Sequence, residues 1–273
     1  MTNRNKSVFN IFLTGGTSYL GRNLIEKTNN VNFYALQHKN KLEEKENLFI
    51  VKNEPKNYHI FFKDNNISHV IHLASSSSED VEKVIKTNIN LGFNLLNSAL
   101  KTRVEKIIFA GSYFQDIYKK NQDFYTLTKD YIEDIQKFYS NTYNLNNSSL
   151  HFGDIYGPKD SRDKLIPYLL KNENNKEIKF DSDGKAPFTP LFIDDAIESI
   201  QNEIFTKTKN NFNSKLIASE LMTVEDFIRD YKTIRGKKFK CIFSSIESKK
   251  YSPESFLKPE NIKIPLSEGL LKL

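Results

Sequence analysis

The sequence predicts an α/β protein with a doubly wound parallel sheet and a smaller C-terminal lobe, and three observations carry this prediction. Short apolar runs alternate with helical stretches through residues 1–158. A glycine-rich turn follows the first apolar run, and prolines divide the remainder into short segments. The 273 residues, 38% of them hydrophobic and with 21 Phe and 13 Tyr, can build a sizeable core, so general disorder is excluded.

The first half of the chain is expected to alternate strands and helices. Residues 8–13 form a β-rich run that ends in Thr14-Gly15-Gly16, and residues 18–27 carry apolar side chains at helical spacing. Further strands are expected at 32–36, 48–51, 70–73, 107–110 and 148–152, and further helices at 81–102 and 125–139. Alternation of this kind is typical of a parallel sheet covered by helices on both faces.

Two closely joined lobes are expected rather than two independent domains. The first lobe covers residues 1–158, and a strand end and helix at 191–206 return to it. The smaller second lobe covers residues 159–190 and 207–273.

Composition and charge exclude several classes of protein. No apolar run reaches the roughly 18 residues that a membrane span needs, and the first residues lead into a strand rather than a signal peptide. The single Cys241 excludes a disulfide framework and a cysteine-based zinc site, and the five histidines lack ligand spacing. The net charge of +6 is spread along the chain, which favours a solvated surface or an anionic small substrate over nucleic acid. We therefore expect a cytoplasmic protein that binds no metal, membrane or nucleic acid.

The glycine-rich turn Thr14-Gly15-Gly16-Thr17-Ser18-Tyr19-Leu20-Gly21 lies between the first expected strand and the first expected helix. Glycine permits a tight turn and lets the backbone approach a pyrophosphate, whose charge the helix N-terminus favours. Ser18 stands in place of the middle glycine of the usual pattern. This position predicts dinucleotide binding, and the alternative is an ordinary turn between a strand and a helix.

The type of residue at the end of the second expected strand distinguishes proteins that bind NAD from those that bind NADP. An acidic residue there binds the ribose 2′-hydroxyl of NAD, whereas a basic residue accommodates the 2′-phosphate of NADP. Here residues 33–36 run into Gln-His-Lys-Asn-Lys at 37–41, and no carboxylate occurs before Glu43. The pattern favours NADP(H), with His38 and Lys39 as candidate contacts. NAD(H) is the alternative, because lysines in such a loop are also simply solvated.

Tyr125 and Lys129 form a Tyr-x-x-x-Lys pair on an expected helix, so the two side chains lie on one face, one turn apart. An ammonium group near a phenol favours the phenolate and lowers its pKa, which is about 10 when unperturbed. Such a tyrosine exchanges protons with a substrate hydroxyl or carbonyl. Ser112 ends the preceding strand, where ligands of open α/β sheets bind, and can hydrogen-bond a substrate oxygen or merely cap a turn.

Taken in this order, these stretches resemble the extended short-chain dehydrogenase/reductases, and among them the nucleotide-sugar epimerase/dehydratase family. The matching positions are Asn88, the Tyr125/Lys129 pair and residues 14–21, 72–75, 109–112, 151–158, 191–196 and 265–270. They span almost the whole chain. The short second lobe is similar to that of the small reductases that complete deoxyhexoses, such as CDP-abequose and CDP-paratose synthases.

The resemblance implies a Rossmann lobe that binds NAD(P) and a second lobe that holds a nucleotide diphosphate. It implies that Tyr125 transfers a proton, that Lys129 holds the nicotinamide ribose, and that Ser112 binds the substrate oxygen while hydride passes to or from a sugar carbon. Together with the loop after the second strand, the expected cofactor contacts are Thr14, Gly15, Thr17, Ser18, Tyr19, Leu20, Gly21, His38, Lys39, Leu73, Ala74, Ser75, Asn88, Tyr125, Lys129 and Phe152. The expected substrate contacts are Ser75, Ser112, Tyr113, Asp154 and Arg162. Members commonly pair through the helices at 81–102 and 125–139, so a homodimer is expected.

Departures from the family pattern narrow the reaction. Ser112 is followed by Tyr113, Phe114 and Gln115, so the acidic residues of dehydratases and decarboxylases are missing, and Cys241 lies too far along the chain for the epimerase-reductase pattern. A ketoreductase or a 4-epimerase remains. Phe188 stands where the family often has an arginine for the diphosphate, and Arg162, Lys164 or Lys185 could replace it.

The leading hypothesis is an NADPH-dependent 4-ketoreductase of a nucleotide-activated (deoxy)hexose in surface-polysaccharide sugar synthesis. The second hypothesis is a nucleotide-sugar 4-epimerase with tightly bound NAD. A third is a catalytically silent NAD(P)-binding scaffold, because the same fold also serves as a binding module.

Overall fold

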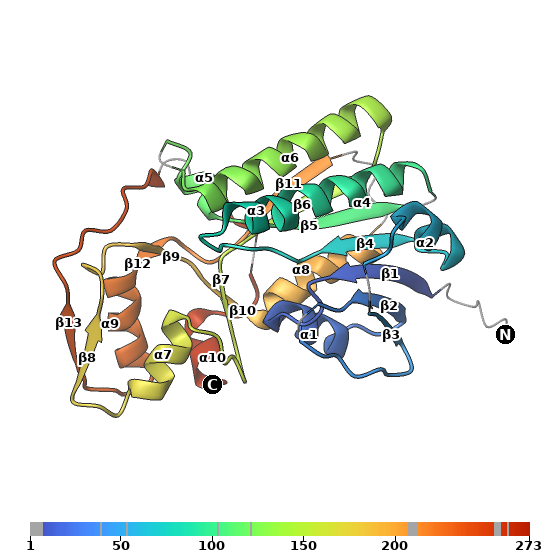
Figure 1. Ribbon diagram of the computed structural model, residues 1–273. Helices are drawn as coiled ribbons and strands as arrows, with labels where there is room; N and C mark the ends of the chain where they lie inside the picture. Colours follow the sequence, from blue (N-terminus) through green and yellow to red (C-terminus); the bar gives the residue numbers. More distant parts are fainter. Residues whose placement is uncertain are drawn as a thin grey trace. The chain divides into compact units, whose positions relative to one another are not determined.

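The computed structural model describes residues 8–38, 40–52, 54–102, 104–120, 122–206, 212–253, 258–260 and 262–273. It divides into two compact units (Figure 1). Unit 1 comprises Met1–Gly111, Asp123–Leu150 and Ile197–Lys215, and unit 2 comprises Ser112–Gln122, His151–Ala196 and Leu216–Leu273. Residues 112–122 and 151–158 thus group with unit 2, whereas the expected first lobe included them. The assignment of one lobe to the cofactor and the other to the substrate stays a prediction.

The central sheet has seven strands in the order β11-β6-β5-β4-β1-β2-β3. The strands are β1 (Phe9–Thr14), β2 (Val31–Leu36), β3 (Leu48–Val51), β4 (His69–His72), β5 (Lys106–Ser112), β6 (Asn147–Phe152) and β11 (Phe212–Ile217). The pairings of β1 with β2 and β4, of β2 with β3, and of β4 with β5 are parallel. The expected doubly wound α/β fold is confirmed.

Helices cover both faces of this sheet. Among the described residues of unit 1 they are α1 (Tyr19–Lys27), α2 (Tyr58–Asp64), α3 (Val81–Val84), the π-helical turn η1 (Ile85–Asn90), α4 (Leu91–Leu100), α6 (Phe124–Tyr143) and most of α8 (Ile193–Phe205). Figure 1 shows α1 and α8 on the opposite face from α4 and α6. Gln201 of α8 donates to the carbonyl of Lys27 at the end of α1 (3.0 Å), and Lys106 at the start of β5 forms a buried ion pair with Glu203 of α8.

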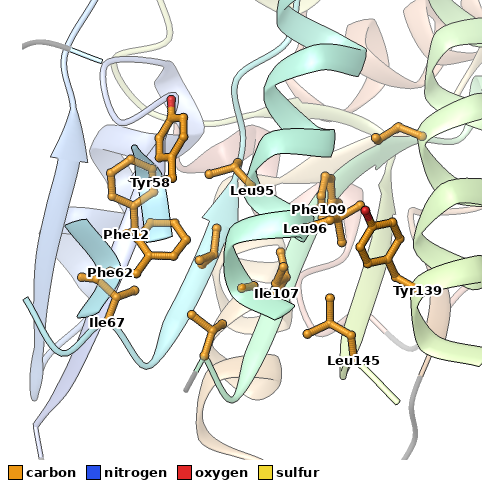
Figure 2. Packing of buried hydrophobic residues seen from close by; sticks show 14 residues of the cluster. Phe12, Tyr58, Phe62, Ile67, Leu95, Leu96, Ile107, Phe109, Tyr139 and Leu145 are labelled. Carbon is orange, nitrogen blue, oxygen red and sulfur yellow. The ribbon is translucent and has the colours of Figure 1, made fainter. Parts of the chain in front are cut away.

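One hydrophobic core cluster of unit 1 lies between the sheet and helices α2, α4 and α6. Phe12 of β1 and Ile107 of β5 pack with Phe62 of α2 and Leu95 of α4, and each is at most 1% exposed (Figure 2). Complete burial of one such side chain contributes about 1.5–3 kcal/mol. This packing fixes the strands whose carboxyl ends carry the predicted site.

Unit 2 contains short elements, and side-chain hydrogen bonds connect several of them. They are α5 (Phe114–Ile117), β7 (Asp154–Tyr156), α7 (Leu165–Asn172), β8 (Glu177–Phe180), β9 (Pro187–Phe188), β10 (Pro190–Phe192), β12 (Met222–Thr223), α9 (Val224–Ile234), β13 (Lys240–Phe243) and α10 (Leu266–Leu271). Glu173 after α7 accepts two hydrogen bonds from the Arg235 guanidinium (2.9 and 3.0 Å), and Arg235 also donates to Leu270 O of α10 (2.9 Å). The bonds from Arg235, together with those from Tyr231 and Lys237, lower the pKa of Glu173 to about 2.

Within the described ranges, no helix combines the length and the hydropathy that crossing a membrane demands.

Candidate active site

The turn between β1 and α1 is closed by two glycines that no larger residue could replace without movement of the backbone. Gly15 has a φ of +75°, and a Cβ at this position would lie 2.7 Å from Ala74 N and from Leu73 C. A Cβ on Gly21 would lie 2.3 Å from Gly15 O. The turn therefore lies directly on the 73–74 loop, and α1 closes directly on the turn. Such a cradle of backbone atoms fits a pyrophosphate.

Ser18 explains how the turn forms without the middle glycine. Its backbone is extended (φ −70°, ψ 165°), a conformation that needs no glycine, and it is the N-cap of α1. Its Oγ accepts a hydrogen bond from Gly21 N (3.0 Å), and its own N–H donates to Gly15 O (2.9 Å). The first turn of α1 contains no acidic residue, so the helix N-terminus retains its positive potential.

Thr14, at the end of β1, joins the turn to the end of β4. Its Oγ1 lies 2.7 Å from Nδ1 of His72 and accepts a bond from Ala74 N (3.3 Å). Burial, assisted by the nearby Lys129 charge, lowers the pKa of His72 to about 3. His72 is therefore a neutral, packed side chain at neutral pH.

Asn88 anchors the loop after β4 from within the π-helical turn η1, where it is 2% exposed. Its Oδ1 accepts from Ser76 N (2.8 Å), and its Nδ2 donates to Ser76 O (2.9 Å) and to Thr128 Oγ1 of α6 (3.0 Å). Ser75, beside this anchor, is exposed. Thr128 was not predicted from the sequence, because its position beside Lys129 gives no signal of this contact.

Tyr125 and Lys129 lie one turn apart at the start of α6. Asp123 is the N-cap of this helix and accepts from Thr126 N (2.8 Å). Lys129 is 5% exposed, its Nζ donates to Ala110 O of β5 (2.7 Å), and Nζ lies 5.8 Å from the centroid of the Tyr125 ring. Burial lowers the pKa of Lys129 to about 8. The lysine is thus fixed between the tyrosine and the carboxyl end of β5.

Ser112 ends β5 and belongs to unit 2. Gln115 Oε1 accepts from Ser112 N (2.9 Å), and Ser112 Oγ accepts from Phe114 N (3.3 Å). Asp116 of α5 contacts the buried His151 of β6 (3.1 Å). These bonds hold the residues after Ser112 against β6.

Tyr113 and Asp154 meet within unit 2. The Tyr113 hydroxyl donates to Asp154 Oδ2 (2.8 Å), which also accepts from Thr189 N (3.0 Å). Tyr113 N donates to the carbonyl of Phe152 (3.2 Å), and Phe152, an expected cofactor contact, is 6% exposed at the end of β6.

Phe188, at the position of the family arginine, and Arg162, one of its expected substitutes, both have partners within the protein. Phe188 is 7% exposed and packs on Phe227, with ring centroids 4.6 Å apart, so it is a core residue. The Arg162 guanidinium makes two bonds of 2.8 Å to Asp160 and one of 2.6 Å to Ile155 O. Asp160 therefore already neutralises Arg162.

Arg22 is a candidate cofactor contact that the sequence analysis missed. This exposed arginine of α1 donates to Thr17 O (3.0 Å) and to Lys41 O (3.2 Å), so it connects the glycine turn with the loop after β2. In that loop Gln37 Oε1 accepts from Leu42 N (2.9 Å), and Lys39 lies outside the described residues. The sequence did offer a signal for this contact, because Arg22 directly follows Gly21, the last residue of the glycine-rich turn.

Over the described part of the chain, no three His, Cys, Asp or Glu side chains are grouped so that they could hold a metal ion.

The comparisons with known proteins agree on one family. The profile of the NAD dependent epimerase/dehydratase family matches residues 11–202. CDP-abequose synthase of Salmonella typhimurium strain LT2 is 25% identical over 143 residues, which are 50% of this chain and 48% of that protein. Uronate dehydrogenase of Pseudomonas syringae pv. tomato is 23% identical over 163 residues, 55% of this chain and 58% of that protein. The chain thus spans about half of the length of the curated relatives that it matches.

Solved structures share the fold over almost the whole chain. UDP-glucose 4-epimerase of Thermotoga maritima, with UDP-glucose, has a TM-score of 0.77 at 20% identity and 97% coverage of both chains. UDP-glucuronic acid 4-epimerase of Bacillus cereus, with UDP-glucuronic acid and NAD, has a TM-score of 0.76 at 18% identity and 97% coverage of both chains. The chain belongs to the NAD dependent epimerase/dehydratase family.

Proposed function

We propose that this protein is an NAD(P)-dependent enzyme of the extended short-chain dehydrogenase/reductase type. More narrowly, we propose an NADPH-dependent 4-ketoreductase of a nucleotide-activated (deoxy)hexose, acting in the cytoplasm in the synthesis of surface-polysaccharide sugars. The observation that carries the proposal is the buried Lys129 ammonium, fixed to Ala110 O one helical turn from Tyr125. The similarity to CDP-abequose synthase supports a deoxysugar nucleotide as substrate.

The chain's own residues would divide the chemistry among them. When bound, the nicotinamide supplies a hydride to the carbonyl carbon of the sugar. The Tyr125 phenol gives its proton to the carbonyl oxygen, and the Ser112 hydroxyl holds that oxygen in place. Lys129 binds the ribose and favours the tyrosinate that remains after the proton has left.

Replacement of Tyr125 by Phe tests the proposed mechanism. Because the phenolic proton is removed, we expect kcat for a nucleotide-linked 4-keto-6-deoxyhexose to fall about 10²- to 10⁴-fold, while the affinity for NADPH stays within about threefold. Tyr131→Phe, an exposed position on the same helix, is the matched control and should keep the wild-type rate. A wild-type rate in Tyr125→Phe would contradict the mechanism.

The NADPH preference is supported by the loop after β2, where Gln37 occupies the place of the acid that NAD-binding proteins use, and by Arg22 beside it. We expect purified protein to bind NADPH at least tenfold more tightly than NADH in a fluorescence titration. Arg22→Leu should remove most of this preference by weakening NADPH binding alone. Arg229→Leu, an exposed arginine of unit 2, is the control. Tighter binding of NADH by the wild type would reject the preference.

A 4-epimerase with tightly bound NAD is the second candidate, and the likeness to solved 4-epimerases in complex with NAD favours it. Protein that releases NAD on denaturation, and that interconverts two nucleotide sugars without added cofactor, would establish this function in place of the reductase.

A further inference from the structure

The carboxylate of Asp154 is rigidly held, yet only one of its two oxygens accepts hydrogen bonds within the described residues. Its Oδ2 accepts from the Tyr113 hydroxyl (2.8 Å) and from Thr189 N (3.0 Å). Its backbone N–H donates to Thr189 O (2.7 Å), and a Cβ on the preceding Gly153 would lie 2.5 Å from that same carbonyl oxygen. Its Oδ1 accepts no hydrogen bond from any residue that the structure describes, and the residue is partly exposed. Oδ1 is therefore a fixed acceptor atom that no described residue satisfies.

The surroundings of this carboxylate make a second negative charge unfavourable there. The charged or titratable groups that act on it are Tyr113, Lys164 and Arg162, and Arg162 is already paired with Asp160. Burial outweighs these hydrogen bonds and cations and raises the pKa of Asp154 to about 6. A hydroxyl group that donates to Oδ1 offsets its lost hydration with a hydrogen bond. A carboxylate brought beside Oδ1 instead meets a like charge in a poorly solvated place.

Within unit 2, Tyr113 links Asp154 to Ser112, the residue proposed to bind the reacting carbonyl oxygen of the substrate. Tyr113 directly follows Ser112, and its ring spans the distance from the end of β5 to the Asp154 carboxylate. If Ser112 holds the carbonyl oxygen of the sugar, as the proposed function requires, Asp154 lies one tyrosine side chain away from it.

We propose that Asp154, positioned by Tyr113 and Thr189, is the specificity-determining residue that accepts a sugar hydroxyl and rejects a sugar carboxylate. The inference rests on the proposed function and narrows its substrate class to nucleotide sugars whose hexose is uncharged. Uronic acid nucleotides are excluded as substrates.

The test compares the affinities of the NADPH-loaded enzyme for UDP-glucose and UDP-glucuronic acid, measured by calorimetry at pH 8. We expect the wild type to bind UDP-glucose at least tenfold more tightly. Asp154→Asn keeps an acceptor oxygen for Tyr113 and Thr189 but removes the charge, so the ratio should fall below about threefold, chiefly through tighter binding of UDP-glucuronic acid. Glu177→Gln removes an exposed carboxylate of the same unit and should leave the ratio unchanged.

A measurement on the wild type alone covers the case in which Asp154→Asn fails to fold. Between pH 8 and pH 5 the Asp154 carboxylate gains its proton, whereas the glucuronate stays ionised, so the preference for UDP-glucose should shrink at least threefold. A ratio that is the same at both pH values, or equal affinities for both ligands at pH 8, would overturn the inference and leave the proposed function standing. If UDP-glucose, CDP-glucose and UDP-glucuronic acid all fail to bind while NADPH still binds, the proposed substrate class itself is wrong.

Discussion

Lys129 is the side chain in which burial and charge are most directly opposed. Its ammonium group is surrounded by protein atoms and has one carbonyl, that of Ala110, as its hydrogen-bond partner in the described contacts. A neutral amine is favoured in such surroundings, and the pKa falls from its ordinary 10.5 to about 8. The lysine therefore loses its positive charge within a range of pH in which the protein can be assayed.

This shift predicts the alkaline limb of the pH–rate profile. The proposed reaction needs Lys129 in its charged form, and the charged form is lost as pH rises through about 8. We expect kcat/KM for the ketone to be level near pH 7 and to fall about tenfold per pH unit well above pH 8. Rates measured from pH 6 to pH 10, with NADPH affinity measured in parallel, check this. A level profile up to pH 9.5 would show that the charge on Lys129 is not required.

Ser18 and Arg162 show how much the type of a single residue predicts about its surroundings. Ser18 breaks the usual glycine pattern, yet its extended backbone and capping hydroxyl keep the turn intact. The predicted role of Arg162 as a diphosphate contact is untested. Its pairing with Asp160 depends on the local fold and could not be read from the residue type.

At the scale of elements, local patterns were sufficient for six of the seven strands of the central sheet, and β11 was not expected. β1, β2, β4, β5 and β6 begin and end within two residues of their expected bounds, and β3 agrees with its expected bounds. Continuous apolar runs bounded by turn residues carry this information. Helix α2 was missed because only Tyr58 and Phe62 are buried in it, which is too little for a visible period.

The helix expected over 81–102 differs from the observed one at its centre. The structure divides it into α3, the π-helical turn η1 and α4. The side chain of Asn88 in η1 binds Ser76 and Thr128, which lie 12 and 40 residues away in the sequence. A π-helical turn of this kind is fixed by tertiary contacts, so a local pattern does not predict it. The two-residue strands of unit 2 escape prediction for the same reason.

The junction of β1 and α1 gives a prediction for the cofactor. Gly21→Ala would place a Cβ 2.3 Å from Gly15 O, so α1 must move away from the turn. We expect NADPH affinity to fall at least tenfold and the free energy of unfolding to fall by about 1–3 kcal/mol. For Gly16→Ala the atoms nearest to the new Cβ belong to the side chains of Ala35, Leu42 and Ile25, at 3.3–3.5 Å, so this variant is the milder control. Equal NADPH affinities for the two variants, measured by titration, would contradict the prediction that the turn between β1 and α1 binds the cofactor.

At the scale of the whole molecule, the exposed faces of α4 and α6 predict self-association. Phe93, Phe138 and Tyr143 are 43%, 54% and 48% exposed, and all three rings contact Tyr139. A contiguous aromatic surface of this kind is uncommon on a monomer. It lies on the helices through which the homodimer is expected, and the homodimer stays a prediction.

We expect a homodimer in sedimentation experiments at micromolar concentration. Phe93→Lys combined with Phe138→Lys should yield a monomer, because charged side chains would be buried without partners in the dimer. Ile60→Lys changes an equally exposed residue of α2 and should leave the dimer intact. A monomeric wild type, or a double variant that still sediments as a dimer, would reject this interface.

The pair between Lys106 and Glu203 has a consequence for the timing of synthesis on the ribosome. The partners are 97 residues apart, and at about 5–20 residues per second Lys106 is synthesised roughly 5–20 s before Glu203. Helix α8 carries Glu203, so the Lys106 ammonium stays hydrated until that helix packs on β5 and brings the opposite charge with it. The face of the sheet that α8 covers therefore stays open to water until the chain has been made to residue 205, and chaperones would be needed most in that interval.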